Sequence, residues 1–457
     1  MKVLSRYGKR ASSGHKADAD ASSPGKTIIK IHDCPGMTRE YTEIVDSFNR
    51  FASKYDGRFE ISQSSSYGMT SDGITIDVLP EGTHYTHVRP NDSEHLFGSI
   101  RSGRTATRFL HTQKTGNDLI VFSRKDDIPF NRMQERVSTF LSGEIDPSSV
   151  EDYSGFGGFG TARKVTAKDL PGFIAGLKRF SGEHDESTSL IDDMVNLSRK
   201  KSDFMNKFIV CNSAGNEPRS CIDHYLVYNN PMNVIEGMLI SAMISGADKG
   251  IICVRNDNDI VKRITSCVEQ AYSFGMIGEC SIRGESSFDI EIVKIPNSIR
   301  DNDVISAIEG RFDNDNKKPE LWGCPAAICS PVALSKLPYL AKESLNGLPV
   351  RKDKKDKSGT KVITILGDLD CTGIAEVNND MTIKDIIFSM CEGMRHGKEF
   401  GAVLARSDAY LFLEKNSLNR KIGSIIAGGC GQLFVFEKSR EKDIAEARSI
   451  SKAFGGR

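Results

Sequence analysis

Between residues 207 and 255 the pattern of apolar and polar positions predicts a strand, a polar loop, a helix and a second strand. The strands are expected at 208–211 and 250–255, where apolar residues run without interruption. Asn230 can cap the helix and Gly246 can end it. In open α/β sheets, a loop at the carboxyl end of a strand is the usual place for a ligand, so this unit is the first candidate site.

The same pattern predicts α/β structure on both sides of this unit. Before it, apolar residues with alternating and helical periods favour an αβ sandwich over residues 26–110. The strands there are expected at 27–32, 59–62, 73–79 and 84–88, with a helix at 38–55. After it, the expected elements are strands at 360–367 and 373–376, a helix at 382–392 and a terminal helix at 439–454.

Length and charge narrow the class of protein. A chain of 457 residues suits roughly three domains. Lys plus Arg and Asp plus Glu balance at 61 each, so no overall field would recruit nucleic acid or an anionic membrane. The sequence holds no apolar run of about 18 residues, the length that spans a bilayer. We therefore expect a soluble protein with no nucleic-acid partner and no transmembrane segment.

Cysteine usage indicates a reducing compartment, either the cytoplasm or an organelle matrix. The 11 cysteines are scattered, and none belongs to a CxxC pair. Their spacing fits neither a zinc pattern nor an iron–sulfur signature, so no metal ligands are predicted. Residues 1–25 are rich in Lys, Arg, Ser and Ala, and they are expected to be a disordered leader or a transit peptide.

Two phrases carry a family resemblance: CNxxxxEPxxCxD from Cys211 and NPxxxIEGMLIxAxxxGA from Asn230. They resemble the flavoprotein subunit, which binds FMN and NADH, of the complex I NADH dehydrogenase module. The same family serves NAD-linked hydrogenases and formate dehydrogenases. The resemblance implies that Asn212 and Glu217 would be the surviving cofactor-binding groups if a flavin is retained. It implies no catalytic residue among the side chains of this chain.

The resemblance also implies a multidomain α/β fold in which a thioredoxin-like domain precedes a Rossmann-like flavoprotein domain and a β-grasp domain of the soluble-ligand-binding type. The expected boundaries are a leader at 1–25, the thioredoxin-like domain at 26–110, the flavoprotein-like domain at 111–350, the β-grasp domain at 351–436 and a C-terminal helix at 437–457. The family's iron–sulfur domain is expected to be absent.

The positions that hold cofactors in the family differ in this chain. A glycine-rich flavin loop would fall on 181–193, which has one glycine and five carboxylates. A carboxylate about 5 Å from a phosphate charge adds roughly 3 kcal/mol of repulsion at an effective dielectric near 20. The alternative, that these acids face solvent, stays open. In the first domain, residues 66–70 carry hydroxyls where thiolates would bind a cluster, and Cys34 is its single cysteine.

These observations favour a non-catalytic structural subunit of an NAD-linked redox complex that binds no cofactor, having lost FMN, NADH and the iron–sulfur clusters. Its expected partners are a flavoprotein paralogue, a thioredoxin-like small subunit and a catalytic oxidoreductase subunit. Two alternatives remain: a divergent FMN-dependent NADH oxidoreductase subunit, and a module that senses a small ligand. The charge run at 351–357 is expected to be a solvated linker, with a basic docking patch as the alternative. The GxGxxG match at 155–160 is expected to be a packing segment.

Overall fold

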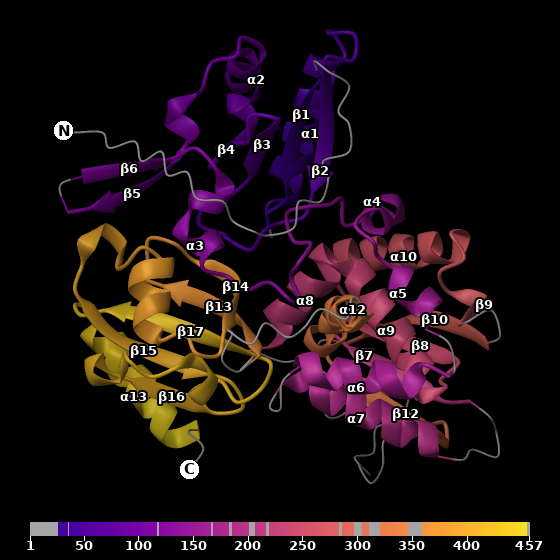
Figure 1. Cartoon of the computed structure of the whole chain (residues 1–457). Helices are drawn as coiled ribbons and strands as arrows, with labels where there is room; N and C mark the ends of the chain where they lie inside the picture. Colours follow the sequence, from indigo (N-terminus) through magenta and orange to yellow (C-terminus); the bar gives the residue numbers. More distant parts are fainter. Residues whose placement is uncertain are drawn as a thin grey trace.

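The computed structural model shows a mixed α/β protein, with four sheets among the residues that it describes (Figure 1). None of its described helices is long and apolar enough to cross a membrane. The described residues are 26–34, 36–116, 118–165, 168–181, 185–200, 206–215, 219–282, 286–296, 304–309, 320–345 and 359–454.

The N-terminal sheet has the strand order β2-β1-β3-β4. Strand β1 pairs in parallel with β2 and antiparallel with β3. Helix α1 buries Tyr41, Ile44 and Phe48, which recur at helical spacing, so the expected helix is confirmed, although it ends before residue 55. The elements are β1 (Thr27–His32), α1 (Thr38–Ala52), β2 (Phe59–Ser64), β3 (Thr75–Leu79), β4 (Thr83–Tyr85) and α2 (Ser93–Arg101).

A two-stranded hairpin and short helices connect this sheet to the next. The glycine-rich segment at 155–160 joins two of these helices, and within it Phe159 packs against Tyr153 with ring centroids 5.2 Å apart. This arrangement agrees with a packing segment. The elements are β5 (His111–Thr115), β6 (Asp118–Phe122), α3 (Pro129–Arg132), α4 (Val150–Gly155) and α5 (Gly160–Lys164).

The central sheet has the order β11-β12-β7-β8-β10-β9, in which the four inner strands are parallel. Helix α9 is buried along its whole length and packs against α7 and α12 (Figure 1). As expected, it begins after Asn230 and ends at Gly246, whose φ of +69° suits glycine. Asn230 makes no capping hydrogen bond, however, and its side-chain NH₂ donates to the Ser142 hydroxyl. The elements are α6 (Leu170–Ser181), α7 (Glu186–Arg199), β7 (Phe208–Asn212), α8 (Arg219–Asn229), α9 (Pro231–Ser245), β8 (Lys249–Arg255), α10 (Asn258–Ser273), β9 (Gly278–Ile282), β10 (Ser286–Ile295), α11 (Val304–Ile308), β11 (Glu320–Leu321), β12 (Cys324–Cys329) and α12 (Pro331–Leu345).

The C-terminal sheet has the order β14-β13-β17-β15-β16. The strand expected at 360–367 is confirmed. The helix expected at 382–392 is present but shorter, mainly as a π-helical segment, Asp385–Met390, which buries Ile386, Ile387 and Met390. The elements are β13 (Thr360–Gly367), β14 (Gly373–Asn378), β15 (Phe400–Arg406), β16 (Tyr410–Leu413), β17 (Cys430–Glu437) and α13 (Glu441–Phe454).

Buried polar contacts join the three larger sheets around helix α8. Asn229 at the end of α8 accepts a hydrogen bond from the Ser66 amide of the N-terminal unit at 3.0 Å. The carbonyl of Gly68 accepts one from the Ile374 amide of β14 at 2.8 Å. Segment 66–70, where the family would place thiolates, therefore forms a contact between units.

Candidate functional site

The carboxyl edge of the central sheet is the candidate site, and Asn212 lies at the end of β7 on this edge. Its Oδ1 accepts a hydrogen bond from the Ala214 amide at 3.1 Å. The next residue, Ser213, donates from both its amide and its hydroxyl to the carbonyl of Cys253 on β8, at 3.0 and 2.6 Å. The first turn of the loop is thus held in place, and the Asn212 side-chain NH₂ remains able to donate to a ligand. Glu217 lies outside the described residues.

A helix replaces much of the loop that was expected at 181–193. Helix α6 continues to Ser181, and α7 begins at Glu186. Asp185 caps α7, since its carboxylate accepts from the Ser187 amide at 2.9 Å and from the Ser187 hydroxyl at 2.6 Å. Leu190 and Met194 recur at helical spacing and are buried, which gives α7 an apolar face.

A buried ion pair lies at the N-terminus of α7. The Lys336 ammonium of α12 lies 2.6 Å from Asp185 and also donates to the Thr360 carbonyl at 3.0 Å. Both charged side chains are almost completely buried. Burial opposes charge on both groups, yet the Lys336 ammonium lowers the pKa of Asp185, and Asp185 raises the pKa of Lys336. The pair is therefore ionised and nearly neutral overall.

The other described acids of this stretch are also engaged. Glu186 accepts a hydrogen bond from the Ser330 hydroxyl at the end of β12, and Asp192 pairs with Lys178 on the surface. Asp193 is the exception: burial, followed by the neighbouring Asp192, raises its pKa. Among the described acids of this stretch, Asp185 and Asp192 thus have their charge offset by a lysine.

A cavity of about 430 Å³ lies at α8, where the units of the N-terminal, central and C-terminal sheets meet. One face of α8 lines it with Tyr225 and Tyr228, and Asp33 lies in its wall. The Tyr228 hydroxyl donates to Asp33 at 2.9 Å, and the Arg263 guanidinium lies over the Tyr228 ring, 3.6 Å from its centroid. Cys221, His224, Asp257 and Asp259 also line the cavity, whereas Cys211 is buried on β7. No lysine or arginine is among the described residues that line it.

The fold and the carboxyl-edge site define a mixed α/β protein with a mostly parallel central sheet. Residues 194–332 match the family model described as the Nuo51 FMN-binding domain. That match covers β7, α8, α9, β8 and β12, the elements that form the candidate edge.

Named relatives agree with this class. The chain is 24% identical over 288 residues to the NADP-reducing hydrogenase subunit HndC of Solidesulfovibrio fructosivorans, covering 60% of this chain and 57% of the relative. It is 27% identical over 281 residues to a subunit of the NADH-quinone oxidoreductase of Escherichia coli, covering 57% and 61%. The chain thus spans less than two thirds of the length of these relatives. The resemblance to this flavoprotein family is confirmed.

A solved structure of an NAD⁺-reducing [NiFe]-hydrogenase in the air-oxidized state has a similar fold. The TM-score is 0.52 at 15% identity, and the similarity covers 93% of this chain and 71% of that chain. At this identity the likeness concerns the fold alone.

The expectation of a chain without cofactors is contradicted by these matches. The matched domain is described as FMN-binding, and several relatives are named as subunits of NADH-quinone oxidoreductases. That expectation rested on the missing glycines and on repulsion from the acids between 181 and 193. Asp185 is instead neutralised by Lys336, which lies 151 residues away in the sequence. A pairing so distant leaves no local pattern, so the repulsion was overestimated.

Sequence reasoning missed a buried chain of polar side chains in the N-terminal unit. Asp77 contacts His32 at 2.8 Å and His84 at 2.5 Å. The His84 ring lies 3.2 Å from the Tyr67 hydroxyl, which in turn donates to Asp72 at 3.4 Å. The phrase THYTHVRPND contains His84 and is rich in polar residues, but the spacing of these residues does not predict the network.

Proposed function

We propose that this chain is a flavoprotein-type subunit of a multi-subunit, NAD-linked redox complex and that it binds FMN at the carboxyl edge of the central sheet. The observation that carries the proposal is the match of residues 194–332 to an FMN-binding domain. The parallel order of β12, β7, β8 and β10 supports the same location, because cofactors of open α/β sheets lie beyond the carboxyl ends of the strands.

The described side chains fit the flavin in part. The Asn212 NH₂ group can donate to a flavin carbonyl or a ribityl hydroxyl. Among the described residues at the start of α7, no free cation is available to bind the FMN phosphate, because Lys336 is paired with Asp185. Asp185 also caps the helix, so its carboxylate occupies the place where a helix N-terminus would bind an anion. A bound FMN would supply the conversion between two-electron and one-electron transfer. The role that this chain supplies is to hold and orient the ring.

A finer assignment follows from the same family. We assign residues 26–110 to a thioredoxin-like domain, 111–350 to a Rossmann-like flavoprotein domain and 351–436 to a β-grasp domain of the soluble-ligand-binding type. A flavoprotein paralogue, a thioredoxin-like small subunit and a catalytic oxidoreductase subunit are the partners that this organisation suits. The scattered cysteines support a reducing compartment.

Flavin binding to the purified full chain tests the proposal directly. We expect the chain to quench the fluorescence of added FMN with saturable, one-to-one stoichiometry. Asn212→Ala should weaken binding by about tenfold, the value of one hydrogen bond to a polar ligand. Asn416→Ala, at an exposed position in the C-terminal unit, is the matched control and should bind as the wild type does. Absence of bound flavin both in the free chain and in its natively isolated complex would overturn the proposal.

The cavity at α8 favours a second candidate function, the recognition of a small molecule. Its volume of about 430 Å³ falls within the range of ligand pockets, and two tyrosines and several acids line it. A library of small cationic and aromatic compounds should then raise the melting temperature of the wild type but not of Tyr228→Ala. Equal shifts in the two proteins would exclude this cavity as the binding place.

A further inference from the structure

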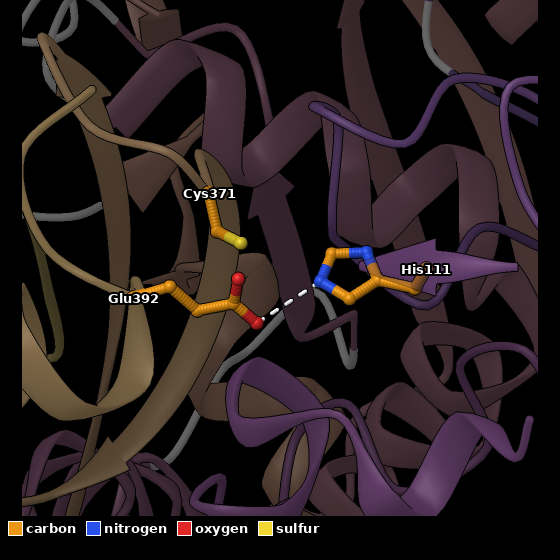
Figure 2. A group of neighbouring side chains, drawn as sticks. All are labelled: His111, Cys371 and Glu392. Atoms are coloured by element: carbon orange, nitrogen blue, oxygen red, sulfur yellow. Dashed lines mark hydrogen bonds and ion pairs between the residues drawn. The ribbon is translucent and has the colours of Figure 1, made fainter. Parts of the chain in front are cut away.

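A buried cluster of three side chains lies between the β5–β6 hairpin and the C-terminal unit. It consists of His111, Cys371 and Glu392 (Figure 2). His111 comes from β5, whereas Cys371 and Glu392 come from connections of the C-terminal sheet. Figure 2 shows the imidazole, the thiol and the carboxylate pointing toward one another across the boundary between the two units. No residue of this cluster belongs to the carboxyl edge described above.

The three ligand atoms lie close enough to share one ion. The nitrogen, sulfur and oxygen atoms are all within 4.8 Å of one another, and His111 Nε2 lies 3.0 Å from Glu392 Oε1. A tetrahedral zinc ion with bonds of about 2.0–2.3 Å keeps its ligands roughly 3.3–3.7 Å apart. Small side-chain adjustments would therefore bring the three atoms to ligand positions.

A further carboxylate orients the histidine. Asp72 lies 3.1 Å from His111 Nδ1, on the side of the ring that faces away from Glu392. With Nδ1–H donating to Asp72, the lone pair of Nε2 points at the thiol and the second carboxylate. Metal-bound histidines commonly have such a carboxylate partner, which fixes the ring and increases its basicity. Asp72 is itself buried and accepts from the Tyr67 hydroxyl.

The backbone also brings the sulfur and the carboxylate together. The Cys371 amide donates to the carbonyl of Cys391 at 3.1 Å, which ties the two connections side by side. The next residue, Glu392, has a φ of +64°, in the left-handed region that non-glycine residues seldom adopt. Its carboxylate lies in the cluster, and such local strain is found more often at functional positions than elsewhere.

We propose that His111, Cys371 and Glu392 bind one divalent transition-metal ion of the zinc class, with a water molecule as the fourth ligand. Thiolate and imidazole are the donors that zinc prefers, and a thiolate with a carboxylate balances the charge of a dication. Binding displaces the thiol proton and any proton carried by His111 Nε2, so the affinity rises with pH. The ion would join the hairpin to the C-terminal unit, positions that are 260 to 281 residues apart in the sequence.

The alternative is a metal-free cluster in which a proton occupies the place of the ion. Burial opposes a charged imidazole, but hydrogen bonds with Asp72, Cys371 and Glu392 raise the pKa of His111 to about 12. An imidazolium between two carboxylates would then be a purely structural contact. The two possibilities differ in metal content and in the role of the sulfur, and both can be measured.

The experiment uses the full chain, stripped with a chelator and then dialysed against Zn²⁺ or Co²⁺. We expect one zinc per chain by elemental analysis and, with cobalt, an intense near-ultraviolet absorption from the thiolate–metal bond. Cys371→Ser should remove that absorption and the stoichiometric zinc, and His111→Gln should remove the zinc. Asp72→Asn should weaken zinc binding by about 10–100-fold, since it acts through the histidine.

Cys391→Ser is the matched control, because Cys391 is an equally buried thiol on the adjoining connection but does not belong to the cluster. It should retain the zinc and the cobalt spectrum. Less than stoichiometric zinc in the wild type would overturn the proposal, as would a cobalt spectrum without the thiolate band. Because both of these readouts use the wild type, a variant that fails to fold does not prevent the decision.

Discussion

At the scale of single residues, Glu236 shows how burial changes a side chain's chemistry. Its carboxyl lies within α9, and the Tyr153 hydroxyl donates to it at 2.6 Å. Burial raises the pKa of Glu236 to about 7, and the hydrogen bonds only partly counteract this effect. The folded chain thus holds a proton over a pH range in which the unfolded chain has lost it.

This difference predicts that stability falls as pH rises. Because the pKa of about 7 in the folded state exceeds the ordinary value of 4.5, the native state binds more protons between these two values. The expected loss is roughly 3 kcal/mol from pH 4 to pH 8. Glu236→Gln should remove this component in urea titrations at several pH values. The exposed Glu446→Gln should keep the wild-type profile, and a Glu236→Gln profile that matches the wild type would contradict the prediction.

At the scale of elements, the contact between α9 and α12 depends on one glycine. A Cβ at Gly237 would lie 2.2 Å from the carbonyl oxygen of Leu334, which belongs to the backbone of α12. The two helices therefore approach each other too closely for any side chain at this position. The family phrase IEGMLI contains this glycine, but the sequence alone does not say which element it faces.

Gly237→Ala should destabilise the central unit by about 1–3 kcal/mol, because one of the two helices has to move. Thermal unfolding followed by circular dichroism gives the measurement. Gly98→Ala is the matched control, since Gly98 lies within α2 and a Cβ there meets nothing within 4 Å. That substitution should leave stability unchanged or raise it by up to about 1 kcal/mol. Equal effects of the two substitutions would show that the close approach is unimportant.

At the scale of the whole molecule, Glu376 of β14 anchors the segment that leads from the hairpin into the central unit. Its buried carboxylate accepts from the amides of Val137, Ser138 and Thr139 at 2.8, 3.1 and 3.0 Å. The hydroxyl of Thr360 donates to the same group at 2.6 Å. One side chain thus satisfies three amides that lie more than 230 residues away in the sequence.

Glu376→Gln should loosen this junction, because the new NH₂ group faces amide donors and cannot accept from them. A cost of about 1–3 kcal/mol corresponds to roughly 5–150-fold faster amide hydrogen exchange in segment 137–139. Exchange mass spectrometry of the full chain measures this effect. Glu399→Gln, at an exposed ion pair with Lys438, should leave the segment unchanged. Protection equal to that of the wild type would show that Glu376 is not the anchor.

The sequence by itself determined the local elements and the family. Periodicity and capping residues are local, so β1, β7, α9 and β13 could be predicted close to their observed bounds. The resemblance likewise rests on contiguous phrases around Cys211 and Asn230. Helix α7 occupies much of the stretch where the resemblance predicts a loop, although Leu190 and Met194 recur at the helical period.

Only the tertiary structure decided the electrostatics and the new cluster. Lys336 neutralises Asp185 across 151 residues, and Glu392 meets His111 across 281. Neither pair leaves a spacing signature, because strand pairing and helix packing bring the partners together from distant parts of the chain. Whether a carboxylate repels an anionic ligand or binds a cation depends on its neighbours in space. The acids of 181–193, together with the missing glycines, led to the expectation of a lost cofactor, which the match to an FMN-binding domain contradicts.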